Sequence, residues 1–220
     1  MMKTYICYLF FLTMTLAVKA QDSLLLNRSF QFEDGIYLSF EDFKNNSPSF
    51  TPDKFDMVYV INPQTLLAQV ASVNLFSEKP FNLSDVWGVC IDGRPYVQID
   101  KEEVGKDLAS FAGISIVGRL CFYSYKKPVD VPIEIKAYNP LNGQPFRTAM
   151  VSRTELRQYN LVLDFLKGEV RTFSKPNLLE WVGKDPQISR LVRSLEPGDG
   201  ETLMRALIAF NDRNLLFIKK

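Results

Sequence analysis

Three glycine-centred turns, each between two apolar segments, constrain the fold of this chain most strongly. Asp92-Gly93-Arg94 lies between Val86–Ile91 and Pro95–Ile99. A Gly directly after Asp between two apolar segments is a strong signal for a β-hairpin. Asn142-Gly143 and Lys167-Gly168 stand between two further pairs of such segments. The turns therefore predict antiparallel strands that are neighbours both in sequence and in space.

The strands expected around the second and third turns have definite limits. The second turn separates Ile133–Tyr138 from Phe146–Val151, and the third separates Tyr159–Phe165 from Glu169–Phe173. Leu66–Phe76 is ambiguous, because its apolar spacing suits a helix while its β-branched residues and short length suit a strand.

A change of pattern near Lys175 divides the chain. Residues 21–174 carry runs of Val, Ile, Tyr and Phe interrupted by Gly, Asn, Asp and Pro, which is typical of strands and turns. Residues 175–216 predict helices, because Asp185-Pro186 is a capped helix start and Gly200–Asn214 is amphipathic. We predict a single α+β domain over 21–220, mainly antiparallel β-sheet with short helices and a C-terminal helical segment.

Two shorter elements are expected near the beginning of this domain. Phe30-Gln31-Phe32 alternates as a half-buried strand does. Ser39 with Asp42 forms a capping-box pattern that predicts a short helix from Phe40 to about Asn45.

The first twenty residues have the pattern of a secretory signal peptide. Lys3 precedes an uncharged apolar run from Ile6 to Val18, which is too short to span a bilayer, and Lys19-Ala20 follows it. Cleavage after Ala20 would leave a mature chain of residues 21–220 without a transmembrane segment. We therefore expect an exported protein that is periplasmic, on the outer surface or extracellular.

The charge of the chain argues against a nucleic-acid partner. The chain has 26 basic and 25 acidic residues and no histidine. Loss of Lys3 and Lys19 with the signal peptide leaves a net charge of −1. A near-neutral chain with scattered basic residues has no electrostatic footprint for nucleic acid. The expected partner is an unknown protein or glycan.

Two cysteines, Cys90 and Cys121, remain in the mature chain, each within an apolar β-like segment. In an oxidising compartment this even pair is compatible with one disulfide. Two buried thiols acting as small hydrophobic groups explain the pattern equally well. The sequence leaves both alternatives open.

No catalytic or metal-binding pattern emerges from the residue types. The absence of histidine excludes the usual Ser-His-Asp and Cys-His arrangements and any zinc site that needs imidazole. No phosphate-binding or dinucleotide glycine motif is present, so we expect no cofactor. Paired carboxylates remain a route to glycan hydrolysis, and Asp85, Asp92, Glu102 and Glu103 lie around the first hairpin.

Aromatic residues suggest binding more than catalysis. Trp87 and Tyr96 flank the turn at Asp92-Gly93. Aromatic rings on a sheet face can stack on sugars or anchor a peptide, although in strands they more often pack into the core. We take Trp87 and Tyr96 as the candidate ligand contacts.

Three segments together resemble an uncharacterised secreted protein family of Bacteroidota-type bacteria. They are Gly35–Asn46 (GIYLSFEDFKNN), Val86–Val97 (VWGVCIDGRPYV) and Leu163–Val170 (LDFLKGEV). The resemblance implies export to a Gram-negative envelope or the medium. It implies no activity and no site residues.

Export and the lack of a catalytic signature lead to one functional hypothesis. We expect a non-enzymatic envelope or extracellular binding module. The alternative is a histidine-free hydrolase that acts on glycans through paired carboxylates.

Overall fold

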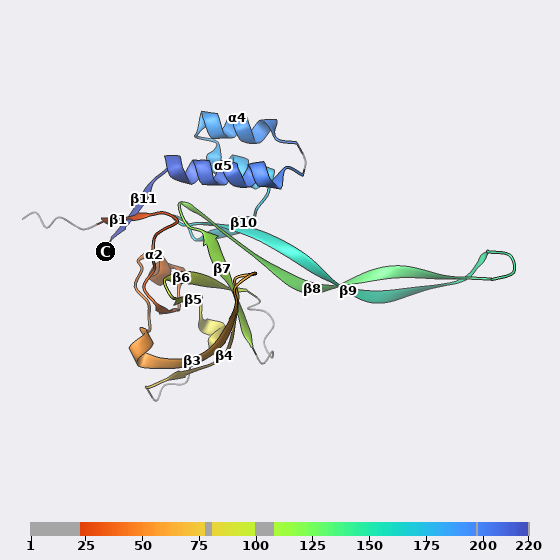
Figure 1. Cartoon of the computed structure of the whole chain (residues 1–220), viewed down its shortest axis with the longest axis horizontal. Helices are drawn as coiled ribbons and strands as arrows, with labels where there is room; N and C mark the ends of the chain where they lie inside the picture. Colours follow the sequence, from red (N-terminus) through yellow and green to blue (C-terminus); the bar gives the residue numbers. More distant parts are fainter. Residues whose placement is uncertain (1–22, 78–80, 100–107, 197, 220) are drawn as a thin grey trace, which may run out of the picture.

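The computed structural model describes residues 23–77, 81–99, 108–196 and 198–219 (Figure 1). The expected signal peptide, Met1–Ala20, lies outside the described residues, as do Glu102 and Glu103. Among the helices that are described, none has the length and apolar character needed to cross a bilayer.

A curled antiparallel sheet of nine strands forms the framework, which confirms the prediction of a mainly antiparallel β protein. Its main path runs β10-β9-β8-β7-β6-β5-β2, and β4 leaves this path at β7 and carries β3 on its other side. Every strand pair is antiparallel. The strands are β2 (Gly35–Tyr37), β3 (Phe55–Asn62), β4 (Leu67–Leu75), β5 (Gly88–Ile91), β6 (Arg94–Ile99), β7 (Ala109–Ile116), β8 (Leu120–Tyr138), β9 (Pro145–Asp164) and β10 (Glu169–Thr172).

All three predicted glycine turns connect paired strands. Asp92 and Gly93 join β5 to β6 with φ values of 53° and 72°. Two consecutive positive φ values match the right-handed twist of a tight hairpin. Gly143 lies in the β8–β9 turn and Gly168 in the β9–β10 turn. The ambiguous segment near Leu66–Phe76 is strand β4.

The predicted capping box near the N-terminus is present. Helix α2 (Phe40–Lys44) begins where the backbone N–H of Asp42 donates to Ser39 Oγ at 3.1 Å, and the Ser39 N–H donates back to Asp42 Oδ2 at 3.2 Å. Phe30-Gln31-Phe32, in contrast, is not a strand. Its Phe32 N–H donates to the Gly93 carbonyl, so the segment crosses the first hairpin as an irregular connection. Two short 3₁₀ turns, η1 (Pro52–Lys54) and η2 (Leu83–Asp85), complete this half.

Three helices follow the sheet: α3 (Lys175–Val182), α4 (Pro186–Ser194) and α5 (Gly200–Arg213). Figure 1 shows α4 and α5 at the end of the body opposite β3 and β4. The helices bury Leu178, Val192 and Leu207 against Leu120 and Val162 of the sheet. The sequence does not predict the small second sheet, in which β1 (Ser23–Leu26) pairs with β11 (Leu216–Lys219).

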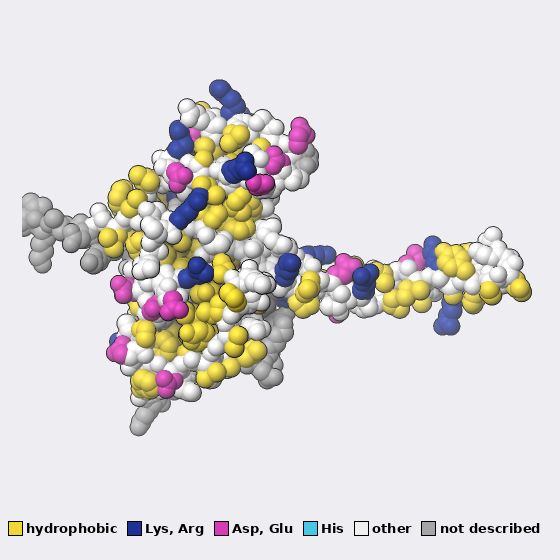
Figure 2. All heavy atoms as spheres, viewed as in Figure 1, with side chains coloured by type: hydrophobic (Ala, Val, Ile, Leu, Met, Phe, Trp, Pro, Cys, Tyr) yellow, Lys and Arg dark blue, Asp and Glu magenta, His cyan; other side chains and the backbone are white. Residues whose placement is uncertain are grey.

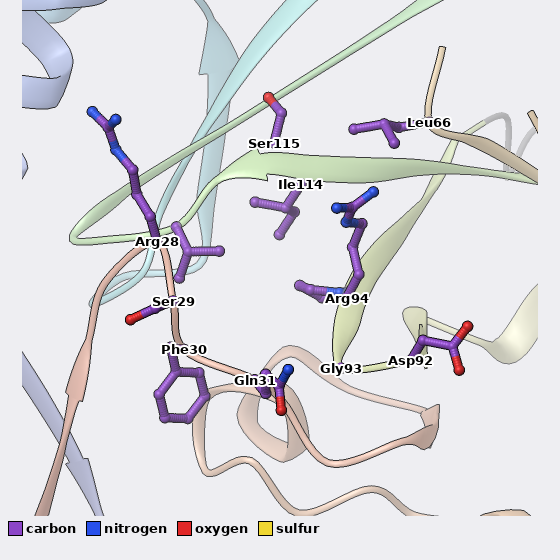
Figure 3. Close-up of a pocket in the computed structure, with 12 residues that line it drawn as sticks. Arg28, Ser29, Phe30, Gln31, Leu66, Asp92, Gly93, Arg94, Ile114 and Ser115 are labelled. Carbon is purple, nitrogen blue, oxygen red and sulfur yellow. The ribbon is translucent and has the colours of Figure 1, made fainter. Parts of the chain in front are cut away.

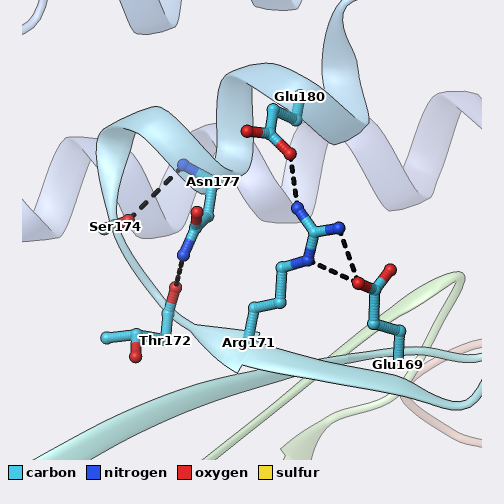
Figure 4. A network of polar contacts seen from close by, with 6 residues as sticks. All are labelled: Glu169, Arg171, Thr172, Ser174, Asn177 and Glu180. Atoms are coloured by element: carbon cyan, nitrogen blue, oxygen red, sulfur yellow. Dashed lines mark hydrogen bonds and ion pairs between the residues drawn. The ribbon is translucent and has the colours of Figure 1, made fainter.

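Polar contacts attach α3 to the edge strand β10 (Figure 4). Arg171 forms ion pairs with Glu169 on its own strand and with Glu180 on the helix. Asn177 Nδ2 donates to the Thr172 carbonyl at 2.8 Å, while Ser174 caps the helix. These contacts hold the helical layer beside the root of the two longest strands.

A second core, which contains a group of packed aromatic rings, lies on the other side of the sheet. Phe43 is fully buried, with its ring centroid 4.6 Å from Phe32 and 4.7 Å from Trp87. Phe165, directly after β9, packs edge-on to Phe43 with ring centroids 5.6 Å apart. The body end of β9 therefore lies between two cores, and this is what anchors its long extension.

Candidate functional site

The most distinctive feature of the molecule is a long two-stranded hairpin that leaves the body (Figure 1). Strand β7 pairs with β8 only at Phe122 and Tyr123, and β10 pairs with β9 only over Leu161–Asp164. From Lys126 onward, β8 has β9 alone as a neighbour within the described chain. We call residues 126–158 the arm. At about 3.3 Å per residue it extends roughly 40 Å.

The root of the arm is rigid because both strands are buried there. Leu120–Tyr123 and Val162–Asp164 have little or no exposure. The Leu120 N–H donates to Asn211 Oδ1 of α5, and Asn211 Nδ2 donates to the Leu120 carbonyl, both at 2.9 Å. Where the arm emerges, the rings of Tyr125 and Tyr159 stack at 5.2 Å. The arm is therefore a fixed extension of the body sheet.

Large apolar side chains along the arm are exposed. Leu141 is 95% exposed, Leu156 72% and Phe146 69%. Figure 2 shows hydrophobic side chains spaced along the arm as far as its tip. The complete set of large exposed hydrophobic residues on the arm is Ile135, Tyr138, Leu141, Phe146, Met150, Val151 and Leu156. Exposed apolar residues grouped on one element are typical of a surface that binds another molecule.

The two faces of the arm differ in composition, because residues opposite each other in an antiparallel pair share a face. One face carries an aliphatic row at every second residue of β8: Val129, Val131, Ile133, Ile135 and Ala137. Val151 and Ala149 of β9 lie opposite Ile133 and Ile135. We call this the aliphatic face. Four charged residues of β9 lie on the aliphatic face as well: Arg147, Arg153, Glu155 and Arg157.

The opposite face is mixed. It pairs Pro128 with Leu156, Pro132 with Ser152 and Glu134 with Met150. At its middle, Thr154 Oγ1 donates a hydrogen bond of 2.7 Å to Asp130 Oδ1. This cross-strand bond fixes the register halfway along the arm.

The tip is an ordered turn that carries no charge between Tyr138 and Phe146. The Gly143 N–H donates to the Asn139 carbonyl at 2.8 Å, and the Asn139 N–H donates to the Gln144 carbonyl at 2.9 Å. The Asn139 side chain also accepts from the Leu141 N–H. These bonds hold Leu141 outward at the end of the arm.

Packing in the body accounts for both aromatic rings that the sequence suggested as ligand contacts. Tyr96 is 3% exposed and lies in the core with Phe111 and Val89. Trp87 is half-buried, and its ring stacks on Phe43. The two residues lie in different hydrophobic clusters. The structure therefore does not bring them together as one binding surface.

Both cysteines are free and buried, with no disulfide between them. Burial raises the pKa of the Cys121 thiol to about 12, and burial together with the nearby Asp34 raises the pKa of Cys90 as well. Cys121 Sγ is 3.2 Å from the Gly118 carbonyl, to which the thiol donates. Of the two alternatives from the sequence, the structure has the buried thiols.

Of the four suggested carboxylates, the structure describes Asp85 and Asp92, which belong to different segments. Asp85 ends η2 and Asp92 lies in the β5–β6 turn, and both are exposed. No group of three or more potential metal-ligating residues occurs within the described ranges.

Two of the cavities in the body lie beside charged side chains. One of about 410 Å³ lies beside the β5–β6 turn and is lined by Arg28, Arg94 and Ser115 (Figure 3). In Figure 3 the Asp92 carboxylate at its rim points away from Arg94. Another, of about 500 Å³, lies between Arg119, Trp181 and Arg213. Here Arg213 already donates to Asp185, which lowers the pKa of that carboxyl. Neither lining contains a nucleophile paired with a base.

The sequence predicted the hairpin at Asn142-Gly143 but not the arm. The expected strands, Ile133–Tyr138 and Phe146–Val151, cover only its outer part. The missed signal is the alternation of Val129, Val131 and Ile133 with polar residues and proline, which has the period of a strand. No family model, no curated protein and no solved structure matches the chain.

Proposed function

We propose that this protein is an exported, non-enzymatic interaction module of the cell envelope or extracellular space, and that the arm is its binding surface. The resemblance to secreted proteins of Bacteroidota-type bacteria supports export. The observation that carries the proposed role is the row of exposed apolar side chains on an arm anchored firmly in the body.

An isolated two-stranded ribbon lacks the neighbouring strands and packed faces that stabilise a larger sheet. A two-stranded hairpin is marginally stable in water, because each strand has one unpaired edge and neither face is covered. Ile135, Phe146 and Leu156 are all exposed on this arm. A partner that covers these side chains would remove apolar surface from water at about 25 cal/mol per Å². An unpartnered arm of this length has no such gain.

Nothing described in the body favours the alternative, a glycan hydrolase with paired carboxylates. That chemistry requires two carboxyl groups roughly 5–10 Å apart across one cleft. Asp85 and Asp92 are exposed and belong to different segments, while Glu102 and Glu103 lie outside the described residues. We therefore base the function on binding.

An affinity capture with a matched arm variant tests the proposal. The bait is mature protein, residues 21–220, exposed to native envelope extract and culture medium, with bound protein and glycan identified. The matched variant replaces residues 128–156 by Asn-Gly, which joins Lys127 to Arg157, residues that are opposite each other in the ladder.

We expect one reproducible partner with the intact chain and its loss with the arm-shortened variant. Capture that is equal for both baits, with the variant folded by circular dichroism, would contradict the role of the arm.

A further inference from the structure

The two edges of the arm differ in their capacity to pair with another strand. In β9, the Asn160 carbonyl accepts from the Phe173 N–H at 2.8 Å, so the backbone of this residue faces away from β8. Successive residues of an antiparallel strand direct their backbone N–H and C=O groups alternately to one side and to the other. The β8–β9 ladder has no irregularity from the pair of Leu120 with Asp164 to the pair of Ala137 with Arg147. Even-numbered residues of β9 therefore present both N–H and C=O to its outer edge throughout the arm.

The outer edge of β8 is interrupted instead. Pro128 is opposite Leu156 and Pro132 is opposite Ser152. Two opposite residues of an antiparallel pair direct their backbone N–H and C=O groups either both toward each other or both away from each other. Leu156 and Ser152 direct theirs away from β8, so Pro128 and Pro132 lie at positions of β8 that face away from β9. Proline has no N–H to donate. An incoming strand would find two donors missing on the outer edge of β8 and every donor present on the outer edge of β9 between Thr148 and Gln158.

We propose that two copies of this chain associate through their arms, β9 against β9 in antiparallel orientation, around a two-fold axis at Val151. The inference rests on the proposed function, because it names the partner of the same arm. It commits to a second copy because a two-fold axis can place Glu155, the one acidic residue in the arm part of β9, opposite an arginine of the other copy.

Charge complementarity selects the register. The charged residues of the arm part of β9 are Arg147, Arg153, Glu155 and Arg157, all on the aliphatic face. A two-fold axis can place Glu155 opposite one of the three arginines of the second copy. Pairing with Arg153 centres the contact on Thr154, and pairing with Arg157 centres it on Leu156. Pairing with Arg147 centres it on Val151.

Only the last of these registers stays clear of the body. An axis at Thr154 or Leu156 runs the second strand past Asn160, whose outer edge is occupied by Phe173, and along the segment paired with β10. An axis at Val151 places residue 145 opposite residue 157, so the contact ends within the arm. In this register no arginine of one copy lies opposite an arginine of the other copy.

The side chains that meet in this register are compatible. On the mixed face, Thr148 lies opposite Thr154 of the second copy, and Met150 lies opposite its Ser152. On the aliphatic face, the two copies of Val151 are opposite each other, with Ile133 beside each one. Thr–Thr cross-strand pairs stabilise antiparallel sheets. The result is a four-stranded sheet, which has the number of strands that a ribbon needs for independent stability.

The proline-bearing strands explain why association stops at two copies. In the order β8-β9-β9-β8, both outermost edges carry Pro128 and Pro132. Edge prolines block the addition of further strands. A two-fold contact that uses the same surface on both copies is closed. The arm therefore leads to a dimer and not to a fibre.

Charge reversal tests the register in solution. We expect mature protein, residues 21–220, to sediment as a dimer. Arg147→Glu and Glu155→Arg each place like charges opposite each other twice per dimer, and each should raise the dimer dissociation constant about tenfold or more. The double variant R147E/E155R restores both pairs and should dimerise like the original chain. Equal dimerisation of all four proteins would overturn the proposed register.

A disulfide across the axis provides a second, independent measurement. The two Val151 residues form a pair without mutual backbone bonds, with Cα atoms about 4.5 Å apart, which is within the range that a disulfide requires. Val151→Cys should give a covalent dimer under mild oxidation. Ile133→Cys is the matched control, because it is on the same face but lies on β8 with β9 between it and the axis. The buried Cys90 and Cys121 do not compete.

The two proposals can fail separately. A chain that stays monomeric at high concentration and is not cross-linked through Val151→Cys would overturn the dimer. Arm-dependent capture of a different protein would then still support the interaction module. Capture unaffected by removal of the arm would contradict the proposed function, whatever the oligomeric state.

Discussion

At the scale of single residues, glycines in similar backbone conformations have different tolerance for a side chain. Gly168 has φ 73° and Gly143 has φ 65°. A Cβ on Gly168 would lie 2.5 Å from the Phe40 ring, which packs against Trp87 and Phe165, whereas a Cβ on Gly143 meets nothing within 4 Å. The first glycine is needed for space and conformation, and the second for conformation alone.

Alanine at these two positions separates the two effects. Gly143→Ala should lower the free energy of unfolding by about 1–2 kcal/mol at most, because only the left-handed backbone is strained. Gly168→Ala should cost roughly 1–3 kcal/mol more, because the Phe40 ring must move within a packed core. Chemical denaturation of both variants measures the difference. Equal losses would show that the ring yields without cost.

The surroundings of Trp87 and Tyr96 depend on residues that are distant in sequence. Both residues flank a turn, and the turn is where the sequence predicts it. Whether a ring near a turn faces solvent depends on what packs over it, and here Phe43 and Phe40 lie against Trp87. Those phenylalanines are more than forty residues away in sequence. No local pattern could reveal the contact.

At the scale of elements, one side chain joins the last helix to the root of the arm. Asn211 of α5 binds both backbone groups of Leu120, which is fully buried. Gly118 makes this approach feasible, because a Cβ there would lie 2.6 Å from the Asn211 side chain. The helix and the strand are therefore coupled through a close contact between distant parts of the chain.

Removal of this contact should destabilise the fold. Asn211→Ala leaves the backbone N–H and C=O of Leu120 unpaired in a buried position. This should lower the free energy of unfolding by roughly 1–3 kcal/mol for each group. Asp212→Ala, at an exposed position of the same helix, is the control and should change stability by no more than about 0.5 kcal/mol. Urea denaturation compares the two. Similar stabilities would mean that water replaces the amide at Leu120.

At the scale of the whole molecule, the arm and the body differ in how they are stabilised. The body has buried cores on both sides of the sheet. The arm is connected to them only through its root, and its outer side chains are exposed. The arm therefore adds reach to the molecule while contributing little buried area to the monomer.

This division predicts a mild effect of shortening. Replacement of residues 128–156 by Asn-Gly should shift the Tm of dilute protein by only a few degrees and leave the near-ultraviolet circular dichroism intact, because no buried core residue is removed. Calorimetry provides the measurement. Loss of the cooperative transition would show that the arm belongs to the folding unit of the body.

The sequence by itself determined the features that depend on neighbouring residues: the three glycine turns, the capping box at Ser39 and the antiparallel class that such turns enforce. Turn chemistry and strand period act over a few residues, so a linear reading detects them. The tertiary structure alone decided the length of the arm, the packing of Trp87 and Tyr96, the free state of Cys90 and Cys121, and the pairing of β1 with β11. The physical reason is that burial and strand pairing depend on segments that meet only after the chain has folded.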